Sequence, residues 1–172
     1  MNAPLSIRIV AAVDADLAPV AELAGIIWRK HYPGIITSGQ IDYMLALGYS
    51  HEALRRFLVD TGAGLLLAYV AGRLVGFAAY YRPDRGEELK LDKLYVHPDY
   101  HGRGIGGALI DRVESAAAAQ ALPTLILNVN RNNVQAIRAY EAKGFKVREA
   151  VVVDIGGGYV MDDYVMAKRV PC

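Results

Sequence analysis

Hydrophobic residues recur at helical spacing through the first third of the chain. Leu17, Val20 and Leu23 follow a pair of aspartates, either of which can cap a helix. Ser38 and Ser50 each precede another stretch with apolar residues at helical spacing, so each can cap a further helix. The first third is therefore predicted to be mostly helical after a short initial strand.

Short apolar runs separated by turns replace this pattern in the rest of the chain. Residues 65–70 and 74–81 flank the turn Ala71-Gly72-Arg73 and predict a hairpin. Helices are expected after residue 105 and after residue 133. We find no internal repeat and no linker, so residues 1–172 are predicted to form a single α+β domain. The predicted strands are 6–13, 65–70, 74–81, 88–96, 125–129, 145–154 and 159–167.

The strand predicted at residues 88–96 changes phase along its length. Its apolar side chains fall at odd positions, Leu89 and Leu91, and then at even positions, Leu94 and Val96. Because side chains alternate with a period of two, a slip of one residue near Asp92 implies a bulge. Such a strand is not expected to pair evenly on both sides.

Composition and charge narrow the class of protein. The chain has 172 residues and is 53% hydrophobic and 22% charged, which is typical of a globular domain. Its net charge of +1 gives no basic excess for nucleic-acid binding. The single cysteine, Cys172, excludes an internal disulfide and a cysteine-rich zinc site. No signal peptide is seen in residues 1–10, and Arg73 interrupts the most apolar stretch, 64–81. A cytoplasmic protein with no metal and no nucleic-acid or membrane partner is expected.

The sequence His101-Gly102-Arg103-Gly104-Ile105-Gly106-Gly107 lies between a predicted strand and a predicted helix. Glycines there let the backbone approach a ligand, and the first amides of the helix favour an anion such as a phosphate. The alternative is a tight loop whose glycines serve only turn geometry. The run also fits G-x-G-x-x-G, but the following strand, 125–129, offers no acidic residue for a ribose, which argues against a dinucleotide fold.

Two longer blocks carry a resemblance to a known family. Residues 94–106, which read Leu-Tyr-Val-His-Pro-Asp-Tyr-His-Gly-Arg-Gly-Ile-Gly, closely resemble motif A of the GNAT N-acetyltransferase superfamily. Residues 133–145, from Asn133 to Phe145, are similar to motif B of that family. The two blocks stand in the family's order and separation. One departure is His101, which stands where the family has glutamine or arginine.

The resemblance implies a GNAT-like fold and acetyl-CoA as co-substrate. The fold would be a single, mixed, mostly antiparallel sheet of about seven strands flanked by helices. It would splay between two central parallel strands that end at Val96 and Val129. Pantetheine would pair with the backbone beside this opening, and amides of the glycine-rich loop would hold the diphosphate. The implied cofactor-binding residues are Leu94, Tyr95, Val96, His101, Gly102, Arg103, Gly104, Ile105, Gly106, Gly107, Asn133 and Tyr140.

Tyr140 matches the tyrosine that serves this family as a general acid. The alternative role is core packing, because Ala136, Ile137 and Tyr140 share one helix face. A phenol with a pKa near 10 is a weaker acid than an ordinary thiol with a pKa near 8.5. Full proton transfer to the thiolate would therefore be uphill by roughly 2 kcal/mol, and hydrogen bonding to it is the better description.

The acceptor amine needs a group that takes its proton, because deprotonating an alkyl ammonium at pH 7 costs about 4.6 kcal/mol. Asp92 and Glu88 are the predicted bases, since both lie on the strand that lines the opening. The alternative is that they are solvated or pair with Lys90 and Lys93.

His31 and His51 are expected at the surface. The alternative for His31 is that it lines an acceptor groove with Trp28, Tyr32 and Tyr43, which flank the same helical region, although single aromatic residues on such helices more often pack in the core.

The expected function is that of an N-acetyltransferase. The protein is expected to transfer an acetyl group from acetyl-CoA to a primary amine of a small molecule or peptide. The amine would attack directly, because no cysteine lies near the predicted site. Two alternatives are a non-catalytic domain that senses acetyl-CoA and a dinucleotide oxidoreductase. A homodimer is possible through the hairpin that turns at residues 156–158.

Overall fold

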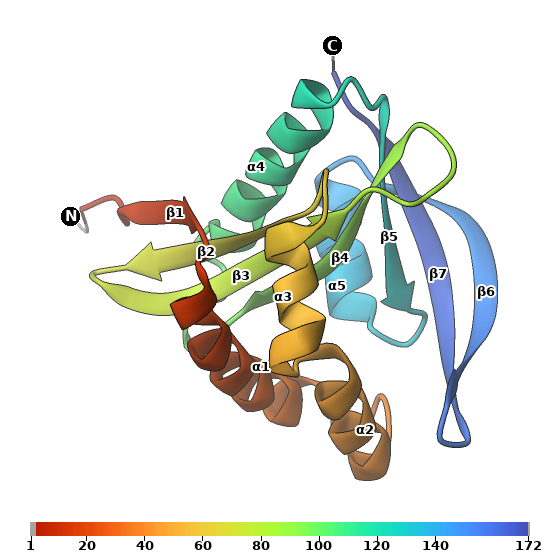
Figure 1. The fold of residues 1–172 in the computed structure, drawn as a ribbon. Coiled ribbons are helices and arrows are strands. Elements are labelled where there is room, and N and C mark those ends of the chain that lie inside the picture. The colour runs from red at the N-terminus through yellow and green to blue at the C-terminus, as the bar shows by residue number, and fades with distance from the viewer. Residues whose placement is uncertain (1–2, 172) are drawn as a thin grey trace.

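The computed structural model describes residues 3–171, which form one seven-stranded sheet with helices on both faces (Figure 1). The strand order is β1-β2-β3-β4-β5-β7-β6. The strands are β1 (Ile7–Ala11), β2 (Gly64–Val70), β3 (Arg73–Tyr81), β4 (Glu88–Val96), β5 (Thr124–Asn130), β6 (Lys146–Gly156) and β7 (Tyr159–Arg169). The helices are α1 (Leu17–His31), α2 (Ser38–Gly48), α3 (His51–Val59), α4 (Ile105–Ala119) and α5 (Val134–Ala142). The α+β class and the mixed sheet are confirmed.

The pairing of β4 with β5 is parallel, whereas all the other strand pairs of the described sheet are antiparallel. It runs from Glu88 opposite Thr124 to Leu91 opposite Leu127 and then stops. Beyond that point β4 stays with β3 while β5 stays with β7. The predicted splay between two central parallel strands is therefore confirmed.

The bulge predicted near Asp92 lies where the splay begins. The β3–β4 register passes from Lys93 opposite Ala79 to Leu91 opposite Tyr80, so Asp92 has no partner residue in β3. The extra residue shifts the apolar phase of β4 by one position, as the sequence pattern indicated.

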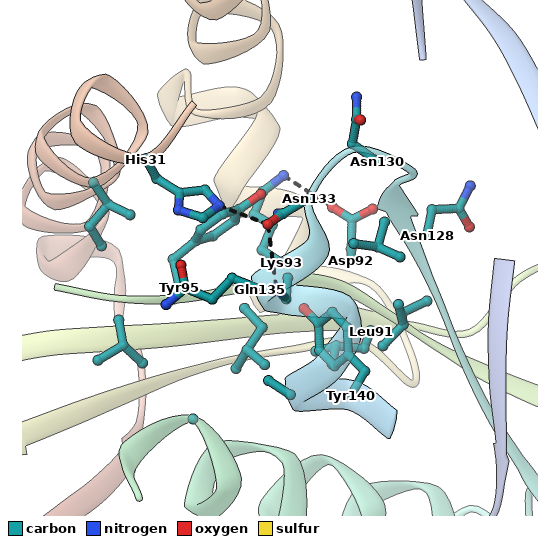
Figure 2. A pocket seen from close by; sticks show the side chains of 18 of the residues that line it. His31, Leu91, Asp92, Lys93, Tyr95, Asn128, Asn130, Asn133, Gln135 and Tyr140 are labelled. Atoms are coloured by element: carbon teal, nitrogen blue, oxygen red, sulfur yellow. Dashed lines mark hydrogen bonds and ion pairs between the residues drawn. The ribbon is translucent and has the colours of Figure 1, made fainter. Parts of the chain in front are cut away.

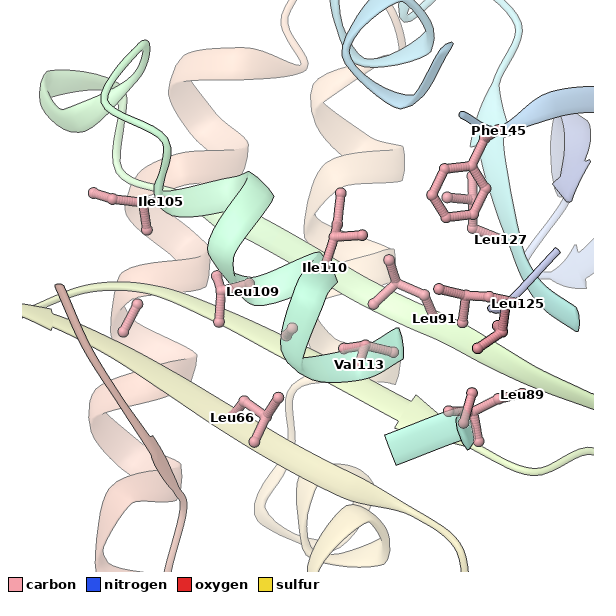
Figure 3. Close-up of a cluster of buried hydrophobic side chains, with 14 of the residues drawn as sticks. Leu66, Leu89, Leu91, Ile105, Leu109, Ile110, Val113, Leu125, Leu127 and Phe145 are labelled. Atoms are coloured by element: carbon pink, nitrogen blue, oxygen red, sulfur yellow. The ribbon is translucent and has the colours of Figure 1, made fainter. Parts of the chain in front are cut away.

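Each face of the sheet has its own hydrophobic core, because neighbouring strand residues point to opposite faces. On β2, Leu66 packs toward α4 (Figure 3), whereas Leu65 and Leu67 belong to the core under α1, α2 and α3. The α4 core also contains Leu89 and Leu91 of β4. The first half of β4 is thereby fixed by packing, and its second half is free to border a cavity.

Helix starts follow the predicted capping residues closely but not in every case. The Ser50 hydroxyl accepts a hydrogen bond from the Ala53 amide at 3.1 Å, so it caps α3 as predicted. The cap of α2 is Thr37 rather than Ser38, because its hydroxyl accepts from the Gln40 amide at 3.2 Å. Asp16 precedes α1 but makes no side-chain cap, since its carboxylate accepts from the Val13 amide instead.

No helix within residues 3–171 is long and apolar enough to cross a membrane. In the same range, no group of three His, Cys, Asp or Glu side chains is placed to hold a metal ion. Cys172 lies outside the described residues.

Candidate active site

A cavity of about 820 Å³ lies where β4 and β5 diverge. Its walls come from α1 and α2, the second half of β4, the loop before α4, the end of β5, α5 and β7. Figure 2 shows His31 and Tyr95 on one side of this space, Asn128 and Asn130 on the other, and Tyr140 between them. The divergence of the two parallel strands therefore creates the space in which segments far apart in the sequence meet.

The backbone of β4 presents unpaired polar groups to this cavity. The His97 amide donates to the Val75 carbonyl of β3 at 2.8 Å. Because backbone groups of successive strand residues point in opposite directions, those of Leu94 and Val96 point away from β3, toward the opening. Leu94, Tyr95 and Val96, which are predicted to bind the cofactor, all line the cavity.

The glycine-rich loop places free amides at the start of α4. Gly102 and Gly104 have φ values of 73° and 81°, a conformation that favours glycine, and nothing lies within 4 Å of a Cβ built on either. Gly104 is the N-cap of α4 and supplies no side-chain cap. Within residues 3–171, the amides from Arg103 to Gly107 donate no hydrogen bond. These amides and the helix dipole form an anion site.

The side chains of this loop behave differently from its backbone. His101 donates through Nε2 to the Val96 carbonyl at 2.8 Å, so it ties the loop to the end of β4. Arg103 stacks over the Tyr100 ring at 5.2 Å and does not line the cavity. The glycine positions of the loop and Ile105 do line it. Arg103 is therefore the one residue from His101 to Gly107, all within the described part of the chain, that does not line the cavity.

Tyr140 combines the two roles considered for it. Its ring is partly buried, packs edge-to-face on Phe145 at 5.8 Å between centroids, and also lines the cavity. Burial and the nearby Tyr32 raise the pKa of Tyr140 above its ordinary value. The phenol therefore stays protonated at neutral pH and can donate a hydrogen bond, while proton transfer from it becomes more uphill.

Asn133 begins α5 and links it to α1. Its side-chain oxygen accepts from the Ala136 amide at 3.4 Å and lies 3.0 Å from His31 Nε2. His51 is exposed and pairs with Asp14, as expected. The surface expectation for His31 was wrong, because the last turn of α1 borders the opening and His31 is half-buried in the cavity wall.

The structure does not bring the two predicted bases together. Asp92 lines the cavity with its side chain 29% exposed, and its carboxylate lies 3.0 Å from the Lys93 ammonium. Glu88 lies at the other end of β4, is ion-paired with Arg148 and does not line the cavity. Only Asp92 is therefore placed where it could meet an acceptor.

One acidic residue in the cavity was missed by sequence reasoning. Asp163 of β7 is 2% exposed and lines the cavity, and burial raises its pKa to about 6. It lies in the stretch Met161-Asp162-Asp163-Tyr164, where nothing in the spacing distinguishes it from its partly exposed neighbour Asp162. The signal that could have found Asp163 is a charged residue at an inward-facing position of a strand, and that position is known only from the structure.

Comparisons with known proteins agree with this geometry. Residues 21–145 match the acetyltransferase (GNAT) family. An uncharacterized N-acetyltransferase of Mycobacterium tuberculosis is 31% identical over 156 residues, which cover 91% of this chain and 97% of the relative. The crystal structure of PaiA N-acetyltransferase from Thermoplasma acidophilum in complex with coenzyme A has a TM-score of 0.81 and 27% identity, over 96% of this chain and 99% of that chain. A GCN5-related N-acetyltransferase structure from Rhodopseudomonas palustris shares the fold, with a TM-score of 0.80 and 24% identity over 98% of this chain and 99% of that chain. The chain belongs to the GNAT acetyltransferase family.

Proposed function

We propose that this protein transfers an acetyl group from acetyl-CoA to a primary amine by direct attack. The observation that carries the proposal is that three features border one cavity. They are the uncapped start of α4, the unpaired edge of β4 and the protonated Tyr140. An anion site, a strand edge and a hydroxyl donor suit the diphosphate, the pantetheine amides and the thioester of one ligand.

The residues present fit acetyl-CoA on physical grounds. The amides from Arg103 to Gly107 have no acceptor in the described chain, and a diphosphate would supply one. Leu94 and Val96 can pair with the amides of pantetheine as a neighbouring strand would. His101 already engages the Val96 carbonyl, which leaves the Val96 amide as the donor at that position. Acetyl-CoA would supply the acetyl thioester.

Two groups of the chain would stabilise charge that develops during the transfer. The Val96 amide, pointing into the opening, would donate to the acetyl oxygen as negative charge grows there. The Tyr140 hydroxyl would donate to the departing sulfur. Since its raised pKa disfavours full transfer, hydrogen bonding is its main contribution. Asp92 is the predicted base that lines the cavity, although Lys93 already compensates its charge.

The test is release of free thiol from acetyl-CoA in the presence of a panel of primary amines. The panel includes alkyl amines, aminoacyl amides, amino sugars and short peptides, each with acetyl-CoA binding measured in parallel. The proposal expects amine-dependent thiol release with formation of the acetylated amine. Binding of acetyl-CoA without thiol release from any amine would instead indicate a sensor domain. Nicotinamide-dinucleotide binding that acetyl-CoA cannot displace would indicate an oxidoreductase.

A further inference from the structure

Asp163 is a buried carboxylate with one oxygen that has no partner in the described chain. The residue is 2% exposed, and its Oδ1 atom has no hydrogen-bond partner within residues 3–171, although the Asn128 amide and the Lys90 ammonium favour its charged form. An ion pair to Asp163 within 4.0 Å is also absent from that range. Burying an unpaired carboxylate is costly, so such a group in a cavity wall points to a ligand that supplies the missing donor or cation.

The fold places Asp163 on the β5 side of the opening. It lies directly opposite Asn130 in the β5–β7 ladder, at the end of β5 that has left β4. Figure 2 shows Asn128 and Asn130 on this side of the cavity. Burial raises the pKa of Tyr32, which follows the last residue of α1, and the Asp163 charge acts in the same direction. The carboxylate is thus close enough to act across the space where a substrate would lie.

The other cavity aspartate differs in one respect. Asp92 has the Lys93 ammonium at 3.0 Å, and that ammonium also lies 4.7 Å from the centre of the Tyr49 ring. The negative charge of Asp92 is therefore compensated within the chain. Among the described residues, Asp163 is the cavity carboxylate that has no ion pair within 4.0 Å.

We propose that Asp163 binds the acceptor as a primary alkylammonium ion and accepts its proton. The proposal rests on the acetyltransferase function and names the substrate class as cationic alkylamines, in preference to neutral aromatic amines. In this account Asp163 is a catalytic residue, because it touches the reacting nitrogen.

The transfer begins with a proton that moves from the bound ammonium to Asp163. The Asp163 carboxylate accepts one proton from the ammonium and leaves an electron pair on nitrogen. That pair forms the bond to the acetyl carbon while the carbon–sulfur bond breaks and its electrons leave on sulfur. The thiolate leaves with its charge stabilised by the hydrogen bond from the Tyr140 hydroxyl, and it then gains a proton from solvent as nitrogen loses its second proton to solvent. Asp163 then releases its proton to solvent, so the products are an amide, a thiol and one proton.

The surroundings of Asp163 suit a proton acceptor. Burial raises its pKa to about 6, and Asp162 acts in the same direction, while the Asn128 amide and the Lys90 ammonium act against them. Tyr32 faces the same space as a neutral phenol. A raised pKa narrows the gap to the ordinary alkylamine value near 10.4, which makes this carboxylate a better base than an exposed aspartate.

Phenethylammonium is a suitable probe, since the cavity is lined by Trp28 and Tyr32 as well as by the acid. Its binding to the full chain is measured by calorimetry, with phenethyl alcohol as the neutral match. The proteins are the native chain, Asp163→Asn, and Asp162→Asn as control, because Asp162 lies outside the cavity and pairs with Arg131. Carbon-13 NMR of the aspartate carboxyls follows the Asp163 titration in the native chain, so the test does not depend on the variant folding.

We expect phenethylammonium to lower the pKa of Asp163 in the native chain and to bind Asp162→Asn equally well. Asp163→Asn should weaken binding roughly 30-fold or more, whereas phenethyl alcohol should not distinguish the proteins. Equal binding of phenethylammonium to Asp163→Asn, or no binding to the native chain, would overturn the proposal. Acetyl-CoA binding is measured on the same samples and tests the acetyltransferase function independently of Asp163. If none of the three proteins binds acetyl-CoA, the acetyltransferase function itself is contradicted.

Discussion

The two sides of the cavity are built in different ways. The side assigned to acetyl-CoA consists of backbone groups from one continuous stretch, Leu94 to Gly107, in which the amides from Arg103 to Gly107 donate no hydrogen bond within the described residues. The side assigned to the acceptor consists of side chains from distant segments, among them His31, Tyr32 and Asp163. A backbone site depends on glycine positions and local turns, whereas a side-chain site depends on how the whole sheet brings its strands together.

The two sides of the cavity also differ in how much they lower the stability of the folded state. Exposed amides at a helix start can bond to water until a ligand replaces it, so they cost little. The Asp163 carboxylate loses its hydration, and the Asn128 amide and the Lys90 ammonium compensate this loss only in part, because its pKa is still raised. The acceptor side should therefore trade stability for function, and the acetyl-CoA side should not.

The largest expected effect is on turnover, and it concerns Tyr140, which lies between the two sides of the cavity (Figure 2). Tyr140→Phe removes the hydroxyl that would donate to the departing sulfur but keeps the ring that packs on Phe145. Turnover should fall roughly 100-fold, the cost of losing one such donor, while acetyl-CoA affinity stays unchanged. Steady-state and single-turnover kinetics measure this. Tyr69→Phe, which lies outside the cavity, is the control. Unchanged single-turnover rates would remove Tyr140 from the mechanism.

The next prediction concerns the stability that Asp163 costs. Its pKa of about 6 in the folded chain exceeds the ordinary value near 3.9 expected when unfolded. Between these values the folded state holds a proton that the unfolded state has lost, so stability falls as pH rises and levels off above about pH 6. Asp163→Asn cannot titrate. Its stability relative to the native chain should therefore rise by on the order of 2 kcal/mol between about pH 4 and pH 7.

Chemical denaturation at several pH values tests this prediction. The Asp162→Asn variant serves as control, because Asp162 is partly exposed and ion-paired with Arg131. Its stability difference from the native chain should change little over the same range. If Asp163→Asn is less stable than the native chain at neutral pH, the side chain has a structural partner and the contrast between the two sides fails.

A matched pair of glycines tests the backbone side. Gly104 and Gly72 have φ values of 81° and 76°, and a Cβ on either would meet nothing within 4 Å. Gly104→Val and Gly72→Val should therefore destabilise the fold similarly. Only Gly104→Val covers the amides at the start of α4, and it should weaken acetyl-CoA binding roughly 20-fold by calorimetry. Equal affinities in the two variants would show that the loop does not bind the diphosphate.

The smallest expected effect is on acetyl-CoA affinity, and it concerns His101. Its hydrogen bond to the Val96 carbonyl holds the loop against β4, and a hydrogen bond of this kind contributes about 1 kcal/mol. His101→Ala should weaken acetyl-CoA binding about fivefold. His101→Gln keeps a donor and should restore most of the affinity. If the alanine and glutamine variants bind alike, the hydrogen bond does not position the loop.

The same contrast explains how much could be predicted from the sequence. The phase slip at Asp92 and the loop glycines are local patterns, and the bulge, the splay and the open amides were found where those patterns indicated. The resemblance of residues 133–145 to motif B pointed to Tyr140, which packs on Phe145 and also faces the cavity.

The acceptor side could not be predicted in this way. Glu88 and Asp92 share a strand, but that strand is long enough to carry Glu88 away from the cavity to Arg148. His31 and Asp163 come together only because α1 and β7 border the same opening. Their burial depends on tertiary packing, and neither residue stands in a spacing that would reveal it.

Amide NMR of nitrogen-15-labelled protein during titration with acetyl-CoA tests directly whether the backbone of the loop and of β4 binds this ligand. We expect the largest changes at the amides from Arg103 to Gly107 and at Leu94 and Val96, with slowed hydrogen exchange at these positions. Binding that leaves these amides unchanged, or no binding at all, would contradict this role of the backbone.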